Sequence, residues 1–261
     1  MRALRFVFSV FLGMTAVTGC KDIPRDNLLD PKNPNSLREQ TVLIEAFVNT
    51  NEDLEDSVAY NQNMLSALKN LKNEYDGKVL LTVHHRSLPA YPDILAINES
   101  EDIYRRYVGA LEGAVKGVPD VFINALGARI QGATTAASAE LRIGSVLQDF
   151  LIRNSYFTIE PAASFSGGTL RCTATIARLG TTPAYDILVK LYVLQNVDER
   201  WLSNAVREVR RSNLLPELQP GERREVDFGQ ITGLAQEPIR IVASVVSEDE
   251  FTVYQAVELG L

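Results

Sequence analysis

Two short apolar segments, residues 41–47 (TVLIEAF) and 78–85 (KVLLTVHH), restrict the fold more than any other feature of the sequence. Each contains β-branched residues and is bounded by polar ones, a pattern typical of buried strands. Between them, residues 58–75 carry apolar side chains at helical spacing, and Ser57 is placed to cap that helix. Two strands that enclose a helix are expected to be parallel and joined by a right-handed crossover.

The next segments add two helices and a hairpin to this unit. Residues 100–113 predict a helix that begins at Ser100, and residues 118–132 predict two short antiparallel strands. Residues 134–154 predict a last helix. Its expected inward side chains are Leu141, Val146, Leu147 and Phe150. The sequence therefore predicts an α/β domain over residues 40–153, with a central mixed sheet flanked by helices.

After Asn154 the helical pattern stops, and short strand-like segments separated by glycine and proline continue to the end of the chain. Many of them alternate apolar and polar residues. This pattern predicts an immunoglobulin-like antiparallel β-sandwich over residues 154–261. Cys172 lies on an alternating inward face, where we expect it to pack as a small apolar side chain. The predicted fold class is α/β plus β.

The N-terminal residues have the character of an export signal. Residues 1–19 combine two arginines, a short apolar run and a small-residue ending, and the sequence VTGC that ends at Cys20 resembles a bacterial lipobox. The resemblance implies cleavage before Cys20, its acylation and a membrane anchor; Lys21 favours the outer membrane. Residues 20–39 are rich in proline, asparagine and charge and predict a flexible tether. An acylated Cys20 leaves Cys172 without a disulfide partner.

The order strand, helix, strand, helix, strand, strand, helix resembles the thioredoxin fold over about residues 40–153. Within it, the segment LIEAF at residues 43–47 resembles the Omp-twenty-eight-related outer membrane protein family of lipoproteins. The Val-His ending of the second strand, the Val-Pro pair at residues 118–119 and the two-domain plan fit the same family. The resemblance implies a cis peptide bond before Pro119.

The reactive cysteine pair of those relatives is absent. The resemblance places Glu52 and Glu55 at the two cysteine positions, and Asp56 at the position of the proline that follows them. Disulfide exchange needs a thiolate that attacks sulfur, and a carboxylate cannot form the mixed disulfide. We therefore expect no oxidoreductase or isomerase activity, and we expect no cofactor.

The resemblance favours a binding function instead. Redox relatives bind extended peptides beside the first helix and the proline, which places a groove at Asn51, Glu52, His84, Val118 and Pro119. We expect a membrane-anchored envelope lipoprotein whose first domain is a redox-inactive binding or scaffold module for a protein or peptide. The net charge of −7 argues against a nucleic-acid partner.

Two other functions stay open from the sequence. The acidic loop 52–56 is compatible with an enzyme or sensor that uses a divalent cation, because hard cations prefer carboxylate oxygens. Its spacing differs from that of an EF-hand loop, and acids at a helix start also complement the helix dipole, so we expect no metal site. His84 and His85 point to opposite faces of a strand and cannot chelate one ion. The last possibility is a purely structural subunit of an outer-membrane assembly.

Overall fold

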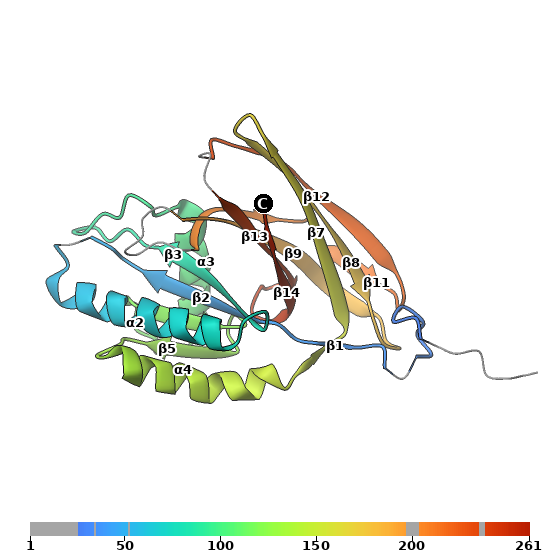
Figure 1. Ribbon diagram of the computed structural model, residues 1–261, viewed down its shortest axis with the longest axis horizontal. Helices are drawn as coiled ribbons and strands as arrows, with labels where there is room; N and C mark the ends of the chain where they lie inside the picture. Colours follow the sequence, from blue (N-terminus) through green and yellow to red (C-terminus); the bar gives the residue numbers. More distant parts are fainter. Residues whose placement is uncertain (1–25, 34, 52, 197–203, 235–237) are drawn as a thin grey trace, which may run out of the picture.

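The chain is mainly β in the part that the structure describes, with one long mixed sheet, a three-stranded antiparallel sheet, a short strand pair and three helices. This computed structural model describes residues 26–33, 35–51, 53–196, 204–234 and 238–261. Figure 1 shows the helices gathered at one end of the molecule and the three-stranded sheet at the other. The predicted signal sequence, residues 1–19, and the acylation site Cys20 lie outside the described residues.

The first half contains the predicted strand–helix–strand unit. β2 (Val42–Val48) and β3 (Val79–His85) are parallel neighbours, and α2 (Glu55–Glu74) connects them. β4 (Asp120–Ile123) pairs antiparallel with β2, and β5 (Ala128–Gln131) follows it as a hairpin. Every residue of β2 and β3 is buried, since both faces of the sheet are covered. The predicted order of these elements is confirmed.

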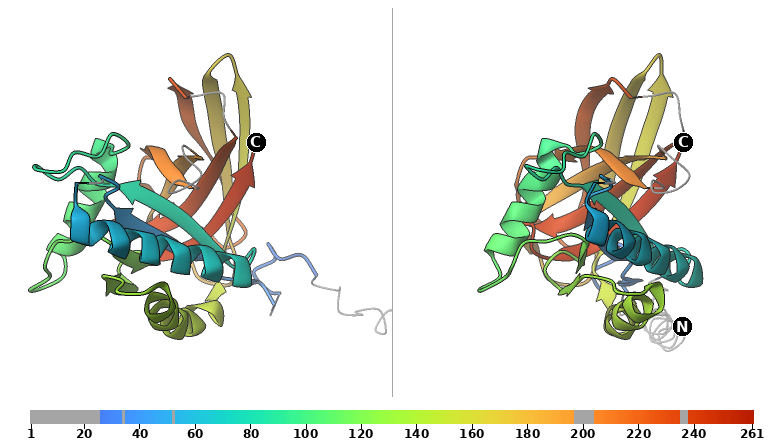
Figure 2. Two further views of the ribbon diagram at one scale, coloured as in Figure 1. Left: turned by 60° about the vertical axis from the view of Figure 1, so that its left-hand side comes forward. Right: turned by 90° about the vertical axis from the view of Figure 1, so that its left-hand side faces the viewer.

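Helices cover both faces of this part of the sheet. α2 and α4 (Ala136–Leu151) lie side by side on one face, and α3 (Asn98–Gly109) lies on the other, as the views in Figure 2 show. Leu147 and Phe150 of α4 are buried as expected, but Leu141 is 75% exposed. The buried residues of α4 recur every three or four positions from Ala139, and Leu141 falls between them. Its inward prediction is therefore wrong.

Two predicted helix starts are also wrong. α2 begins two residues before Ser57, with Leu54 at the N-cap and no side-chain capping bond. α3 begins at Asn98, which places Ser100 inside its first turn. The Ser100 hydroxyl instead lies 2.9 Å from Nδ1 of His84. The sequence pattern predicts that this hydroxyl caps the helix, but in the structure it is bonded to a buried histidine.

The long sheet continues from the first half of the chain into the second. β10 lies parallel beside β3, with Ala205 opposite Val83, and the order continues through β9 and β13 to β14. The strands of this part are β9 (Ala184–Gln195), β10 (Ala205–Arg211), β11 (Leu215–Leu218), β13 (Ile239–Ser247) and β14 (Val253–Gly260). On the α3 face, apolar residues of both halves form one core. The two predicted domains therefore share a sheet and a core.

A three-stranded antiparallel sheet packs over the second half of the long sheet. It consists of β7 (Phe157–Ser166), β8 (Thr169–Arg178) and β12 (Arg223–Thr232). Alternate residues of β8, among them Cys172, point into the core between the sheets, as the sequence predicts. The second half is thus a pair of packed sheets.

Residues 27–33 and 35–39 of the predicted tether pack against the body of the protein or bond to one another. The Ser36 hydroxyl accepts a hydrogen bond from the Gly180 amide at 2.9 Å, and β1 (Arg38–Glu39) pairs with β6 (Asn154–Ser155). Gly221 has φ +79°, and a Cβ there would lie 2.6 Å from the Leu29 carbonyl oxygen. The prediction of a flexible tether fails for these residues, because their polar groups bond to the sandwich half and to each other.

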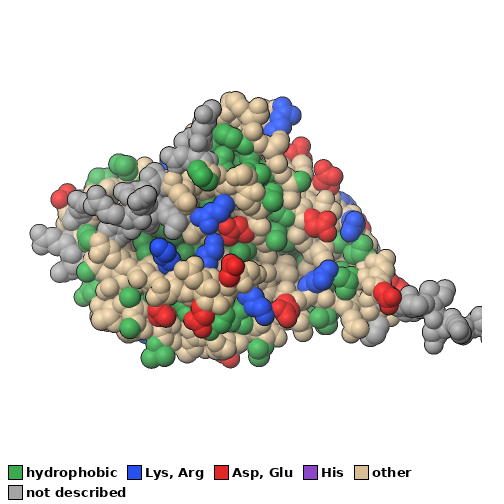
Figure 3. All heavy atoms as spheres, in the orientation of Figure 1, with side chains coloured by type: hydrophobic (Ala, Val, Ile, Leu, Met, Phe, Trp, Pro, Cys, Tyr) green, Lys and Arg blue, Asp and Glu red, His purple; other side chains and the backbone are tan. Residues whose placement is uncertain are grey.

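The surface in Figure 3 mixes basic and acidic side chains, and neither sign forms a large continuous patch on that face. Lys72 and Arg240, for example, lie 3.0 Å and 3.2 Å from the two carboxylate oxygens of Glu258. Within the described ranges, no helix has the length and apolar character needed to cross a bilayer.

Candidate binding site

The predicted groove residues lie where β2 and β3 end and β4 begins. Asn51 follows β2, and Val118 and Pro119 precede β4 and are joined by the expected cis peptide bond. Glu52 lies outside the described residues. Glu55 is the first residue of α2, and its side chain is not described.

Asp93 organises the loop beside Asn51. Its carboxylate accepts hydrogen bonds from the amide and hydroxyl of Thr50, at 2.8 and 2.9 Å, and from the Leu95 amide at 2.9 Å. Nδ1 of His85 lies 3.0 Å away. Burial raises the pKa of Asp93, but the bond and charge of His85 and the two backbone amides outweigh it and lower the pKa to about 2. The carboxylate is therefore ionised at neutral pH and fixes this loop to the end of β2.

Three asparagines hold the segment that follows β2. The side-chain amide of Asn49 donates to two backbone carbonyl oxygens of the loop after β3, each at 2.8 Å. Asn61 of α2 donates to the Asn49 carbonyl at 2.8 Å, and Asn51 donates to the Pro92 carbonyl at 2.9 Å. These bonds pair carbonyl oxygens that no neighbouring strand pairs. They join the segment after β2 and the loop after β3 into one unit.

Arg86 connects this unit to the segment that leads to Pro119. Its guanidinium donates to both carboxylate oxygens of Glu101, at 2.8 and 2.9 Å, and to the Gly117 carbonyl at 3.3 Å. It also lies 3.5 Å from the centre of the Tyr104 ring. Arg86 is only 4% exposed, so its side chain fills the space between β3 and Gly117.

Two apolar side chains project from these loops. Ile94 is 95% exposed, although Asp93 and Leu95 on either side of it are buried. Val115 is 72% exposed, and its carbonyl accepts hydrogen bonds from the side chains of Arg129 and Gln131. These two residues, together with Asn51 and Val118, are called the strand-end surface below.

His84 is not part of this surface. It is fully buried on the α3 face of the sheet, with its ring stacked on Phe47 at 4.7 Å between centres and bonded to Ser100. Burial and then the positive charge of Lys190 lower the pKa of His84 well below its ordinary value. The ring is neutral at pH 7, and it cannot contact a ligand at the surface.

A buried polar network lies next to His84. The two carboxylate oxygens of Glu45 accept hydrogen bonds from the hydroxyl groups of Tyr107 and Tyr192, each at 2.7 Å. Burial and the charge of Glu45 raise the pKa of both tyrosines well above its ordinary value, so both stay protonated. Nζ of Lys190 lies 3.7 Å from Oε1 of Glu45. The network therefore joins β2 and α3 to β9 of the second half.

The network ends at Glu250, in the turn between β13 and β14. Lys190 lies 3.1 Å from one oxygen of Glu250, and Arg106 and Arg211 lie 2.6 and 2.7 Å from the other. Burial raises the pKa of Glu250, but the positive charge of Lys190, the hydrogen bond from Arg106 and the charge of Arg211 lower it to about 2. Three cations thus hold this carboxylate ionised.

The thiol of Cys172 lies far along the chain from positions 52 and 55, in the core between the two sheets. Burial raises the pKa of Cys172 to about 11. Thiolate, the reactive form, is therefore scarce at neutral pH.

Sequence reasoning misses several of these residues. Glu45 and Lys190 each stand alone among apolar neighbours in a strand, which is a usable signal of a buried charge pair. Asp93, Ile94 and Arg86 lie in an irregular loop between β3 and α3, where no periodicity distinguishes a buried residue from an exposed one.

Comparisons with known proteins give a fold but no family. No family model matches the chain, and no curated protein matches it. HBP35 of Porphyromonas gingivalis has a similar structure, with a TM-score of 0.58 and 13% identity over 86% of this chain and 76% of that one. Protein AGR_C_4864 from Agrobacterium tumefaciens has a TM-score of 0.52 and 14% identity over 85% of this chain and 95% of that one.

A domain of the outer membrane lipoprotein Omp28 from Porphyromonas gingivalis matches 40% of this chain and 87% of its own length, with a TM-score of 0.29 and 16% identity. That TM-score supports no conclusion. At 13 and 14% identity, the first two likenesses show the fold alone.

Proposed function

We propose that this protein is a lipid-anchored recognition module of the cell envelope that binds a protein or peptide and performs no thiol chemistry. Acyl chains on Cys20 hold it at the outer membrane, and the partner contacts the strand-end surface. In this proposal the first half is a thioredoxin-like scaffold without its cysteine pair, and the second half is an immunoglobulin-like sandwich, as in the Omp28-related lipoproteins that the sequence resembles.

The observation that carries the proposal is the exposure of Ile94 on a fixed loop. The hydrogen bonds to Asp93 and the buried Leu95 hold the backbone on both sides of Ile94, yet its side chain is in water. Burying apolar surface contributes about 25 cal/mol per Å². A loop that is already ordered loses little conformational entropy when a partner binds. An isoleucine displayed in this way suits a contact site.

The chemistry of the thiol supports the second part of the proposal. Cys172 is buried with a pKa of about 11, and the two positions that correspond to the reactive pair are glutamates. Neither group supplies the exposed, low-pKa thiolate that disulfide exchange needs. Recognition remains as the function that the surface supports.

Photocrosslinking in intact cells tests the partner site. A photoreactive residue in place of Val115 is combined with Ile94→Arg or, as a matched control, with Ile152→Arg, which changes a residue 81% exposed next to α4. We expect Ile94→Arg to reduce the yield of specific adducts by about tenfold, as for an interface anchor. Ile152→Arg is expected to leave the yield unchanged. Identical adducts from all three proteins would contradict the assigned site.

Metabolic labelling tests the anchor separately. Labelled palmitate is expected to appear in the wild-type protein and to be absent from Cys20→Ser, which should also leave the membrane fraction. Labelling that persists in Cys20→Ser would show that Cys20 is not the acylated residue.

A further inference from the structure

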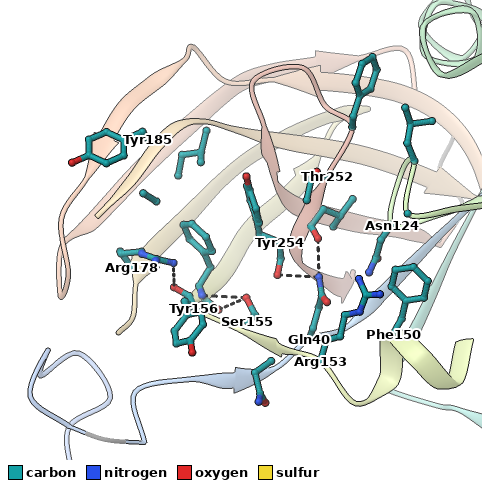
Figure 4. Close-up of a pocket in the computed structure, with 18 residues that line it drawn as sticks. Gln40, Asn124, Phe150, Arg153, Ser155, Tyr156, Arg178, Tyr185, Thr252 and Tyr254 are labelled. Carbon is teal, nitrogen blue, oxygen red and sulfur yellow. Dashed lines mark hydrogen bonds between the residues drawn. The ribbon is translucent and has the colours of Figure 1, made fainter. Parts of the chain in front are cut away.

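A cleft of about 570 Å³ opens between the first half and the sandwich, away from the strand-end surface. Figure 4 shows Asn124, Phe150 and Arg153 at one end of it and Arg178 with Tyr156 at the other. Its volume falls in the range of sites that bind small molecules or short peptide segments. None of the residues of the strand-end surface lines this cleft.

Asn124 supplies a buried hydrogen-bond donor without an acceptor. Its backbone amide donates to the Leu43 carbonyl at 2.8 Å, and its side-chain Oδ1 accepts from the Leu43 amide at 2.8 Å. Because the Leu43 amide needs an acceptor, the side chain cannot be turned over, and the remaining group is Nδ2. Nδ2 is buried in a residue that is 4% exposed, and it has no partner among the described residues. Because buried donors are almost always paired, we expect the acceptor for Nδ2 to come from outside the chain.

The charge of the cleft is positive and unbalanced. Arg153 and Arg178 line it, no aspartate or glutamate does, and neither arginine forms an ion pair with any described residue. Nε of Arg153 donates to the Asp149 carbonyl at 3.1 Å, and the guanidinium lies 4.1 Å from the centre of the Phe150 ring. Its terminal nitrogens therefore retain unused donors on a side chain held beside Asn124. In a chain of net charge −7, such a site attracts an anion.

Apolar and aromatic groups form the walls between the two arginines. Phe150 lies at one end, Phe251 and Tyr254 belong to the β13–β14 turn and β14, and Ile187 lies in β9. Tyr254 stacks on Phe157 with ring centres 5.4 Å apart, which fixes this wall. A ligand for the cleft therefore combines an anionic acceptor with an apolar body.

We propose that the cleft binds an organic carboxylate attached to an apolar body, either a free acid or the C-terminus of a peptide with a bulky apolar last residue. Asn124 and Arg153 bind the carboxylate, because the planar guanidinium and the amide both offer N–H donors to it. The aromatic walls cover the apolar body. This site is separate from the strand-end surface, so a result for or against it does not test the partner proposed there.

Titration of the full chain with matched pairs of ligands tests the site. The probes are 4-phenylbutyrate against 4-phenylbutyramide, and an N-acetylated peptide ending in Leu-Phe against its C-terminal amide, followed by NMR. We expect at least one acid to bind with a Kd of about 1 mM or lower, and its amide to bind at least about tenfold more weakly. Tighter binding of the peptide identifies a chain terminus as the natural ligand, and tighter binding of phenylbutyrate identifies a free acid.

Two variants assign the binding to the named residues. Arg153→Gln removes the charge from an exposed side chain, and Asn124→Asp keeps the acceptor for Leu43 while it replaces the donor with a negative oxygen. Each is expected to weaken acid binding by about tenfold or more. Arg142→Gln, which changes an exposed arginine of α4 outside the cleft, is expected to have no effect. Thermal unfolding verifies that each variant is folded. Acids and amides that bind equally, no saturable binding at about 10 mM, or unchanged binding by Arg153→Gln would overturn the proposal.

Discussion

Nζ of Lys190 lies 3.1 Å from Oε2 of Glu250, and the two side chains are 1% and 3% exposed. Replacing Lys190 with methionine removes the cation beside the buried Glu45 and one of the three cations around Glu250. We expect a loss of about 3–5 kcal/mol in the free energy of unfolding, the usual cost of breaking a buried pair. Urea denaturation measures it.

A surface pair provides the control for Lys190. Lys72→Met breaks a pair with Glu258 whose side chains are each 19% exposed, and it is expected to cost less than about 1 kcal/mol. The double variant Lys190→Met/Glu45→Gln should recover part of the stability, since it removes the buried carboxylate that has lost its cation. Equal losses of stability in Lys190→Met and Lys72→Met would show that the buried network contributes no more to stability than a surface ion pair.

Acid is expected to weaken the fold between about pH 4.5 and pH 2. The pKa values of Asp93 and Glu250 fall to about 2 in the folded protein, from ordinary values of 3.8 and 4.5. A lowered pKa means that the stabilisation is complete above the ordinary value and is lost as the pH falls through the folded value. Denaturation with urea across this range measures the decline. Asp93→Asn should be less stable by about 1–2 kcal/mol at pH 7 and should decline less steeply; an unchanged slope would contradict the role of Asp93.

The thiol of Cys172 is expected to resist modification in the native protein. Burial blocks access, and a pKa of about 11 keeps the thiolate scarce below about pH 10. Ellman's reagent should react slowly with the folded protein and completely in guanidinium chloride. The protein should also show no catalysis in an insulin reduction assay. Rapid stoichiometric reaction at pH 7 would mean that the second half opens readily.

Leu147 and Leu141 offer a direct test of which face of α4 is buried. Leu147 is fully buried under α2 and the sheet, so Leu147→Ala is expected to cost about 2–5 kcal/mol. Leu141 is 75% exposed, and Leu141→Ala should change stability by less than about 0.5 kcal/mol. Thermal and urea unfolding of the two variants should separate them clearly; comparable losses would mean that α4 is rotated.

The elements of the first half can be predicted because each carries its own local pattern. β2 and β3 are continuous apolar runs, and α2 and α4 repeat apolar residues with helical spacing. The prediction for Leu141 is wrong because the buried face of α4 is narrower than the spacing of its apolar residues suggests. The pairing of Val83 with Ala205 leaves no local trace, since it joins strand edges that lie far apart in the sequence.

The candidate sites are harder to predict from the sequence than the helices and strands. Resemblance leads to Asn51, Val118 and Pro119, but the burial of His84 depends on Phe47 and Ser100, which cover it from two elements. The unpaired side-chain amide of Asn124 becomes visible only when the bond between its Oδ1 and the Leu43 amide is known. Composition and spacing carry no information about such pairings.

The core under α3 includes Val253 and Ala256 of β14, the last strand of the chain. During synthesis, the earliest strands therefore leave the ribosome with their hydrophobic partners still unmade. β3 keeps an open edge until β10 arrives, and α3 lacks part of the surface that it packs on until β14 is complete. A chain that stops in the second half would leave this apolar surface uncovered and is expected to aggregate.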